Sequence, residues 1–336
     1  MIDTGPLEAW LVEALRIEPG AAGRFEVETL AGGASNLTLG VSVGRHRVVV
    51  RRPPLGHFLP TAHDMGREHR IYRAVHGTPV PVPEPLAFCE DESVLGAPFQ
   101  VMARVDGIVP NGPEDLAGVS ADVNARCADA YVDVLCAIHD LDVDAVGLGE
   151  LSKRDGYLER QVARWTDQWA RSKDGDVAAI DDLADRLRRA LPRQAETTLV
   201  HGDYRLGNCI LDAAAPDRIL AVLDWEMATL GDPLADLGYA VFWWGTRDRV
   251  LTSPSQAVAD LPGFPRADAV VERYTSASGR DGATIDFHVV LAAFKLAVIG
   301  EGQRARMRRT GVDVPDGGVA PLADWAVDYA DRKGVR

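Results

Sequence analysis

Polar side chains interrupt a series of short apolar runs in the middle of the chain, and this spacing is the feature that most constrains the fold. Asp203 and Asn208 lie between the first two runs, and Asp224 follows the third. Because short strands that follow one another closely bring their connecting turns together, we expect these three side chains to converge on one small volume. The β-type runs are 198–200, 209–211 and 219–223.

Two carboxylates and an amide in this order suit phosphoryl transfer. That reaction needs one carboxylate to orient and deprotonate a hydroxyl group. It also needs oxygen ligands that hold magnesium across the phosphates, and a second carboxylate together with an amide supplies them. The spacing therefore predicts a phosphoryl-transfer site on the turns of this segment.

The segment 201–208, His-Gly-Asp-Tyr-Arg-Leu-Gly-Asn, resembles the phosphotransferase motif of the aminoglycoside phosphotransferase and choline kinase superfamily. In that motif His-Gly-Asp, four variable residues and Asn precede a short hydrophobic run that ends in Asp, and the match has no gap. The resemblance implies that Asp203 is the catalytic base and that Asn208 is a magnesium ligand. It implies that Asp224 corresponds to the first residue of the protein-kinase Asp-Phe-Gly motif, and that the cofactors are ATP and Mg²⁺.

A second segment, 231–237, matches the same family, in which its second Asp, here Asp236, supports the catalytic loop from below. His201 corresponds to a residue that orients the loop rather than one that transfers protons. Taken singly, His-Gly-Asp also fits an ordinary turn, and Asp232-Pro233 fits a helix start. Two motifs in the right order at the right separation favour the family.

Composition sets the outer limits. The chain has 336 residues, of which 46% are hydrophobic, so it can fill a core and form two domains. Neither an apolar run of about 20 residues nor a signal peptide is evident, so we expect a cytoplasmic protein with no membrane partner. The net charge of −14 argues against a nucleic-acid partner. The four cysteines form no CxxC pair, and we expect them to be reduced thiols in the core.

The sequence pattern changes near residue 105, from short β-type runs to long helical patterns. This change, with the resemblance, predicts an α+β class and a bilobal protein-kinase-like fold. We expect an antiparallel-sheet N-terminal lobe, 1–104, that binds nucleotide, and a mainly helical C-terminal lobe, 105–336, for catalysis and substrate binding. The β-type runs are 24–30, 38–43, 47–51 and 99–104, and the helical patterns are 67–75, 125–139, 157–171, 177–190 and 287–309.

The segment 30–38 holds Gly-Gly with Ser and Asn between two strand-like runs. Glycine lets the backbone approach phosphates, and the side chains supply hydrogen-bond donors. The segment resembles the nucleotide-binding loop of the family, so Gly33, Ser35 and Asn36 are candidate nucleotide contacts. A simple hairpin turn is the alternative.

Arg51 stands where kinase-like lobes carry a lysine that grips the α- and β-phosphates. Arginine keeps the positive charge and adds a bidentate fork, and the Val-Val-Val-Arg-Arg-Pro-Pro form resembles a subfamily associated with acyl-CoA dehydrogenases. Glu68 shares the apolar face of its helix, where a carboxylate is costly unless paired, so we expect it within ~4 Å of Arg51. A solvated strand end for Arg51 and a favourable helix-start charge for Glu68 are the alternatives.

The run 100–107 resembles the last N-lobe strand as it enters the hinge. Met102, Ala103 and Val105 are therefore assigned to the nucleotide, where the backbone reads the adenine edges, and an ordinary strand-to-turn transition fits equally well. Because the family binds its acceptor with the C-terminal lobe, the candidate substrate residues are Arg205, Trp225 and Glu226.

Two further clusters have a structural and a functional interpretation. Trp243 and Trp244 fit the core better than a ligand cage. The arginines at 304, 306, 308 and 309 fit a solvated helix end, or a surface that attracts a phosphate-bearing acceptor such as a CoA thioester.

These observations predict an ATP-dependent small-molecule kinase that transfers the γ-phosphoryl group to a substrate hydroxyl. The acceptor is expected to be a hydroxyacyl-CoA or an aminoglycoside-like compound. One alternative is a nucleotide-binding pseudokinase without turnover, supported by Arg51. Another is a metal-dependent hydrolase using Asp203 and Asp224, although the chain lacks the His-rich ligand set of such sites.

Overall fold

The computed structural model describes residues 4–18, 23–30, 36–55, 64–173, 177–244, 254–311 and 318–336. Its contacts divide the chain into two compact units. The first comprises residues 1–107 and 220–226, and the second comprises residues 108–219 and 227–336. Among the helices of the described ranges, none combines the length and apolar character that a membrane crossing requires.

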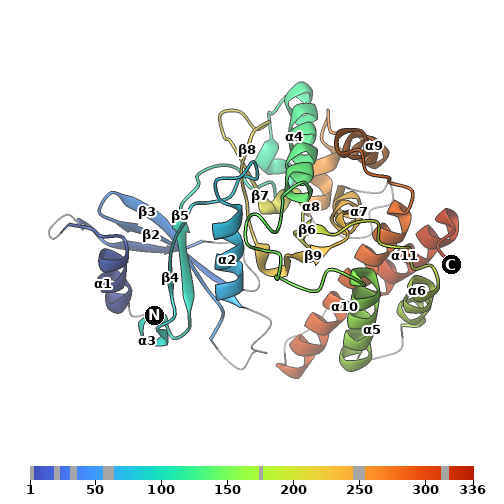
Figure 1. The fold of residues 1–336 in the computed structure, drawn as a ribbon, viewed down its shortest axis with the longest axis horizontal. Coiled ribbons are helices and arrows are strands. Elements are labelled where there is room, and N and C mark those ends of the chain that lie inside the picture. Colours follow the sequence, from blue (N-terminus) through green and yellow to red (C-terminus); the bar gives the residue numbers. More distant parts are fainter. Residues whose placement is uncertain are drawn as a thin grey trace. The chain divides into compact units, whose positions relative to one another are not determined.

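The first unit is built on a five-stranded antiparallel sheet with the strand order β1-β2-β3-β5-β4 (Figure 1). The strands β2 and β3 form a hairpin. After β3 the chain forms the helix α2 (Met65–Val75) and then the edge strand β4, so β5 pairs with β3 on one side and with β4 on the other. The strands are β1 (Glu26–Thr29), β2 (Leu37–Val43), β3 (His46–Arg52), β4 (Pro85–Cys89) and β5 (Phe99–Ala103).

Alternation along β3 separates the two faces of this sheet. Val48 and Val50 belong to the core cluster that contains Leu7 and Leu11 of α1 (Gly5–Ala14). Arg51 therefore lies on the opposite face, where α2 (Met65–Val75) packs against β4 and β5. Figure 1 shows α1 and α2 on opposite sides of the sheet. A short helix, α3 (Glu92–Leu95), contacts α1.

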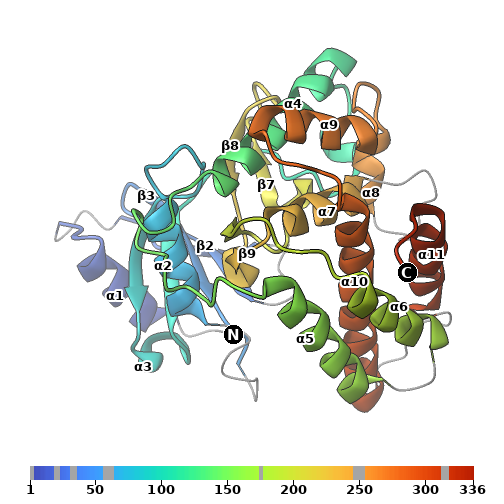
Figure 2. The same ribbon diagram turned by 45° about the vertical axis from the view of Figure 1, so that its right-hand side comes forward.

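The second unit is mainly helical and is organised around the long helix α10 (Ile285–Arg309), which contacts α5, α6, α7 and α11 (Figure 2). The strand β6 (Thr198–Val200) pairs antiparallel with β9 (Thr229–Gly231) beside this bundle. The other helices are α4 (Ala121–His139), α5 (Tyr157–Ser172), α6 (Ala178–Arg189), α7 (Pro233–Trp244), α8 (Pro254–Ala257), α9 (Ala267–Ser278) and α11 (Ala320–Lys333). The strand β7 (Cys209–Leu211) also belongs to this unit, whereas β8 (Ile219–Val222), which pairs with β7, runs into the segment 220–226 of the first unit. Short 3₁₀ turns cover 113–116, 206–208, 225–227 and 258–260.

The predicted α+β class, with an antiparallel sheet in the N-terminal part and a helical C-terminal part, is confirmed. The helix expected from residue 125 begins at Ala121, because Ser120 caps it by accepting the Val123 N–H. β4 was not predicted, since it begins at Pro85 and proline is a weak strand signal. The predicted lobes 1–104 and 105–336 did not include the return of residues 220–226 to the first unit. All four cysteines are free and buried, as expected.

Candidate active site

The turn that follows β6 carries the His-Gly-Asp motif of the second unit. Gly202 has φ +82°, a left-handed conformation that side chains rarely adopt. A Cβ at this position would lie 2.7 Å from the carbonyl oxygen of Met227, so the turn has no room for one. Glycine is thus required here by both the backbone and the packing.

Asp236, near the start of α7, fixes the backbone of the His-Gly-Asp turn through hydrogen bonds. Its two carboxylate oxygens accept the backbone N–H groups of His201 and Gly202 at 2.6 and 2.7 Å. Burial opposes ionisation of Asp236, yet its contacts with His139, His201 and the Gly202 N–H more than offset this, and its pKa lies below the ordinary value. The predicted support of the loop by Asp236 is confirmed.

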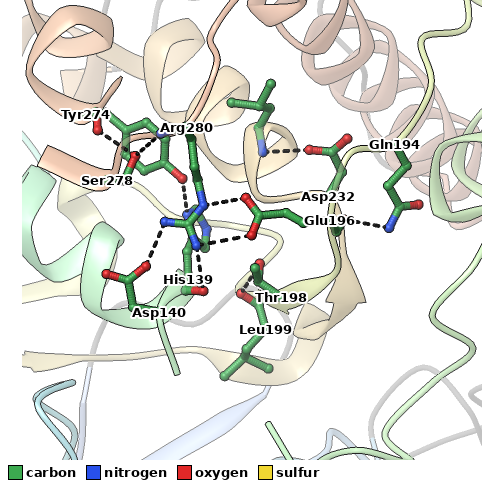
Figure 3. A network of polar contacts seen from close by, with 11 residues as sticks. His139, Asp140, Gln194, Glu196, Thr198, Leu199, Asp232, Tyr274, Ser278 and Arg280 are labelled. Carbon is green, nitrogen blue, oxygen red and sulfur yellow. Dashed lines mark hydrogen bonds and ion pairs between the residues drawn. The ribbon is translucent and has the colours of Figure 1, made fainter. Parts of the chain in front are cut away.

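A polar network surrounds Asp236 in turn. His139 Nε2 lies 3.4 Å from an Asp236 oxygen, and His139 Nδ1 lies 2.7 Å from the Tyr274 hydroxyl. Arg280 donates to Asp140, Glu196 and the His139 carbonyl oxygen, which ties the ends of α4 and α9 to the segment before β6 (Figure 3). The carboxylate that fixes the turn is therefore itself fixed.

The side chains of the motif then meet one another. The Asp203 N–H donates to His201 Nδ1 at 3.2 Å, which agrees with the expectation that His201 orients the loop. Asn208 Nδ2 donates to both the carbonyl oxygen and the Oδ2 of Asp203, each at 2.8 Å. The amide nitrogen of Asn208 thus faces Asp203, and its oxygen is left for another ligand.

Two further groups lie beside the Asp203 carboxylate. Burial and the Asp203 charge raise the pKa of the Tyr239 hydroxyl, which keeps it protonated as a donor toward this carboxylate. Arg205 Nε lies 3.8 Å from Asp203 Oδ1, and its guanidinium lies 5.3 Å from the ring centroid of Trp243. Trp244 is buried and donates to the Pro265 carbonyl oxygen, so it is a core residue, as expected.

In the first unit, Arg51 joins two carboxylates. Its Nη1 lies 2.5 Å from Glu68 Oε1, and its Nη2 lies 2.6 Å from Asp224 Oδ1. Glu226 is more distant, with Oε2 3.9 Å from Arg51. The predicted Arg51–Glu68 pair is confirmed, and the neighbouring Arg52 instead donates to the Pro53 carbonyl oxygen.

Glu68 is 1% exposed and its environment is unfavourable for charge. Burial raises its pKa to about 7, although Arg51 acts in the opposite direction, and Asp224 and Glu226 add to the increase. For Arg51 the two carboxylates outweigh its burial, and its pKa is raised. The cluster is thus one cation shared among three acidic groups.

Asp224 has φ +67°, which is uncommon for a residue other than glycine. Its N–H donates to the Tyr72 hydroxyl at 3.1 Å. Tyr72 lies one turn after Glu68 on α2, so one helix face contacts both Arg51 and Asp224 through these two residues. Tyr72 was not predicted as a site residue, although its spacing of four from Glu68 places both on one face of α2.

The other residues predicted to contact the nucleotide or the substrate include Asn36, Gly33, Ser35 and Trp225. Asn36 Nδ2 donates to Glu226 Oε2 at 2.9 Å, which places both in the Arg51 cluster of the first unit. Gly33 and Ser35 lie outside the described residues. Trp225, expected at the substrate, is fully buried and donates to the Val222 carbonyl oxygen, so it is a packing residue instead.

In the segment 102–105, which was expected to form the hinge, several backbone groups already take part in hydrogen bonds of the sheet. Met102 is buried and pairs with Val49 across the β3–β5 ladder. The Ala103 N–H donates to the Glu84 carbonyl oxygen at 2.8 Å, and the Arg104 N–H is bonded in the same way to Arg47 at 3.0 Å. Contacts from this segment to an adenine would therefore use its carbonyl oxygens or the N–H of Val105.

The predicted convergence of Asp224 with Asp203 and Asn208 stays a prediction, because Asp224 belongs to the first unit and the other two belong to the second. The oxygen donors of Asn208 and Asp224 nevertheless fit the preference of magnesium for oxygen ligands. Within the described ranges, no group of three His, Cys, Asp or Glu side chains is arranged to hold a metal by itself. A site that shares its metal with phosphate oxygens needs fewer protein ligands.

Comparison with known proteins identifies the family of the chain. Residues 26–270 match the model of the phosphotransferase enzyme family. The chain belongs to this family. It is 32% identical to acyl-CoA dehydrogenase family member 10 of Mus musculus and 34% identical to member 11 of Gallus gallus. The two alignments cover 94% and 90% of this chain but only 30% and 40% of those relatives, so it spans less than half of their length.

Solved structures of phosphotransferases have the same fold. A protein of Ralstonia eutropha JMP134, provisionally named an aminoglycoside phosphotransferase, superposes with a TM-score of 0.81 at 32% identity, over 99% of both chains. Aminoglycoside phosphotransferase APH(4)-Ia in complex with ADP and hygromycin B gives a TM-score of 0.64 at 17% identity, over 98% of both chains. The predicted kinase-like fold is confirmed.

Proposed function

We propose that this phosphotransferase transfers the γ-phosphoryl group of ATP to a hydroxyl group of a small molecule, with Asp203 as the general base. The observation that carries the proposal is the pair of hydrogen bonds from Asn208 Nδ2 to the carbonyl and carboxylate of Asp203. They fix the carboxylate on a turn whose backbone is already held by Asp236. A positioned carboxylate of this kind can accept the proton of an attacking hydroxyl.

Asn208 and Asp224 are the proposed magnesium ligands. The Asn208 amide nitrogen is occupied by Asp203, which leaves an amide oxygen, and Asp224 contributes a carboxylate. When bound, the metal would neutralise the negative charge of the phosphate oxygens. Because Arg51 lies 2.6 Å from Asp224 in the structure, loading the metal would have to compete with this ion pair.

The nucleotide is assigned to the first unit. Arg51, held by Glu68, is proposed to contact the α- and β-phosphates, since its guanidinium offers several N–H donors in a fixed plane. The other proposed contacts are Gly33, Ser35, Asn36, Met102, Ala103 and Val105.

The acceptor is proposed to be a hydroxyacyl-CoA, with an aminoglycoside-like compound as the alternative. The first choice is supported by the relatives named after acyl-CoA dehydrogenases, and the second by the phosphotransferases of the same fold. Arg205 and Glu226 remain the proposed acceptor contacts. The arginines of α10 add little support, because Arg304 and Arg308 lie 3.7 and 3.3 Å from Glu301 of their own helix.

The test is magnesium-dependent release of ADP with a panel of hydroxyacyl-CoA thioesters, aminoglycosides and simple alcohols, with ATP binding measured in parallel by calorimetry. We expect the wild-type protein to release ADP with at least one acceptor and Asp203→Asn to lose this activity. Asp217→Asn is the matched control, because Asp217 pairs with the exposed Arg126 and not with a residue of the motif. Loss of nucleotide binding in Asp203→Asn with intact turnover would contradict the assignment of the base.

A pseudokinase is the second candidate, and one observation favours it. Arg51 stands in place of the usual lysine and bonds to the carboxylate proposed to hold the metal. Nucleotide binding without ADP release across the whole panel would support this candidate over the kinase.

A further inference from the structure

The lysine of α10, Lys295, contacts the turn that carries Asp203. The Nζ of Lys295 lies 2.5 Å from the carbonyl oxygen of Gly202, the residue before Asp203. The ring centroids of Tyr239 and Trp165 lie 4.8 and 5.8 Å from the same atom. All of these residues belong to the second unit, and the sequence analysis did not identify Lys295.

This ammonium group is held at a cost. Burial lowers the pKa of Lys295, while the carboxylates of Asp203 and Asp236 favour its charged form. Among the described residues, no carboxylate oxygen lies within 4.0 Å of its Nζ to form an ion pair. Lys295 is half-buried, and a lysine in such a position without a close counter-ion is a candidate functional residue, because burying an unpaired charge is expensive.

The hydrogen bonds of Lys295 are also incomplete. A lysine ammonium carries three N–H donors, and one of them is used by the Gly202 carbonyl oxygen. Lys295 also lines a cavity of about 30 Å³, which has room for roughly one water-sized group. The polar and aromatic residues around this cavity include Tyr157, Gln161, Trp165, Tyr239 and His288.

We propose that Lys295 is a further catalytic residue, which binds an anionic or hydroxyl oxygen next to Asp203. That oxygen belongs either to the phosphoryl group during transfer or to the acceptor. The inference rests on the proposed function, in which Asp203 receives the acceptor proton. Phosphoryl transfer places negative charge on oxygens beside the base, and an ammonium held in advance against a carbonyl group and two rings can stabilise it without reorganising.

The rival explanation is that Lys295 only supports the turn through the Gly202 carbonyl. A neutral donor of similar length would serve that purpose as well as a cation. Stabilising negative charge on a phosphoryl or acceptor oxygen, in contrast, requires a positively charged side chain. Three substitutions separate the two roles: Lys295→Arg keeps the charge and the donors, Lys295→Gln keeps a donor without the charge, and Lys295→Met keeps neither.

The experiment compares these variants with wild type for kcat, the acceptor KM, ATP affinity and thermal melting. We expect kcat/KM for the acceptor to fall by about 10²-fold in both Lys295→Gln and Lys295→Met, with ATP affinity unchanged within a few-fold, and to fall much less in Lys295→Arg. Lys173→Met is the matched control, because Lys173 also lies over a tryptophan ring, Trp169 at 5.8 Å, but is exposed and far from the motif in sequence. Wild-type activity in Lys295→Gln would overturn the proposal.

Two additional measurements complete the test. The first is the rate of the slow hydrolysis of ATP by water in the Lys295 variants. If Lys295 contacts the phosphoryl group, this rate falls together with the rate of transfer. If Lys295 contacts the acceptor, the hydrolysis rate is unchanged and the acceptor KM rises. Binding of ADP with aluminium fluoride, measured by calorimetry, is a readout that does not require turnover, and we expect it to weaken in Lys295→Gln under the first arrangement. If wild type shows no ADP release with any acceptor, the proposed function fails. Equal losses of kcat/KM in all three Lys295 variants, together with lowered melting temperatures, overturn only the role of Lys295.

Discussion

The candidate residues fall into two halves, one in each unit, that are stabilised in different ways. In the first unit, one guanidinium, Arg51, is shared by the carboxylates of Glu68 and Asp224. In the second unit, the carboxylate of Asp236 accepts two backbone N–H groups, and an amide side chain holds Asp203. Backbone hydrogen bonds fix a geometry, whereas a shared cation can redistribute its contacts when another anion arrives. The difference predicts a rigid turn at 201–208 and an adaptable charge cluster around Arg51.

The largest effect is expected from the rigid half. Asp203→Asn removes the proposed base while keeping the size of the side chain, so we expect kcat to fall by about 10³-fold or more. ATP affinity, measured by calorimetry, should remain within a few-fold of wild type because the base contacts the acceptor. A variant that lost ATP affinity and kept its turnover would reverse the roles assigned to the two halves.

The matching change in the adaptable half is Asp224→Ala. It removes a proposed magnesium ligand and one partner of Arg51, so we expect nucleotide binding to lose its dependence on magnesium and to weaken by about 10²-fold. Titration of nucleotide with and without magnesium checks this. Retained magnesium dependence would place the metal on other side chains.

Asp236→Asn tests whether the turn is as rigid as its hydrogen bonds indicate. The asparagine amide has a single oxygen, so it can accept only one of the two backbone N–H groups, those of His201 and Gly202. The other N–H group would then face the NH₂ group of the amide. We expect a loss of about 2 kcal/mol in the free energy of unfolding, measured by urea denaturation, together with a lower kcat. A variant as stable as wild type would show that the turn is held by other contacts.

Contacts between residues that are close in the chain could be predicted from the sequence, whereas contacts between distant elements could not. The turn at 201–208 was predictable because its residues are close in the chain, and the Arg51–Glu68 pair followed from strand alternation and a helix face. The contacts of Asp224 with Arg51 and Tyr72 were not predictable, since they join residues 173 and 152 positions apart. The same holds for Lys295 and Gly202, which are 93 positions apart. Local patterns place a side chain on a face but do not reveal which distant element packs against it.

A smaller effect is expected at Arg51. Arg51→Lys keeps one cation between the carboxylates, so we expect substantial activity, whereas Arg51→Met should raise the KM for ATP by about 10-fold and lower kcat. Steady-state kinetics over a range of ATP concentrations measures both. Equal behaviour of the two variants would show that the charge at this position does not matter.

The smallest effect is a pH dependence confined to the adaptable half. The pKa of Glu68 is raised to about 7 in the folded protein from an ordinary value of 4.5, so the folded state holds this proton more tightly than the unfolded state. The resulting stabilisation is present below pH 4.5 and is lost as the pH rises through about 7. We expect the melting temperature of wild type to decrease relative to that of Glu68→Gln over this range, by a few degrees. Parallel melting curves for the two proteins would show that Glu68 does not titrate there.

The return of residues 220–226 to the first unit has a consequence for biosynthesis. A ribosome that has completed residue 107 must add the 112 residues from 108 to 219 before it reaches the segment with Asp224 and Glu226. At typical elongation rates this takes roughly 10 s. During that interval the nascent chain contains Arg51 and Glu68 but neither of the later carboxylates. The turn at 201–208 is made before residue 224, so a newly made chain acquires its proposed base before the acidic partners of Arg51 are complete.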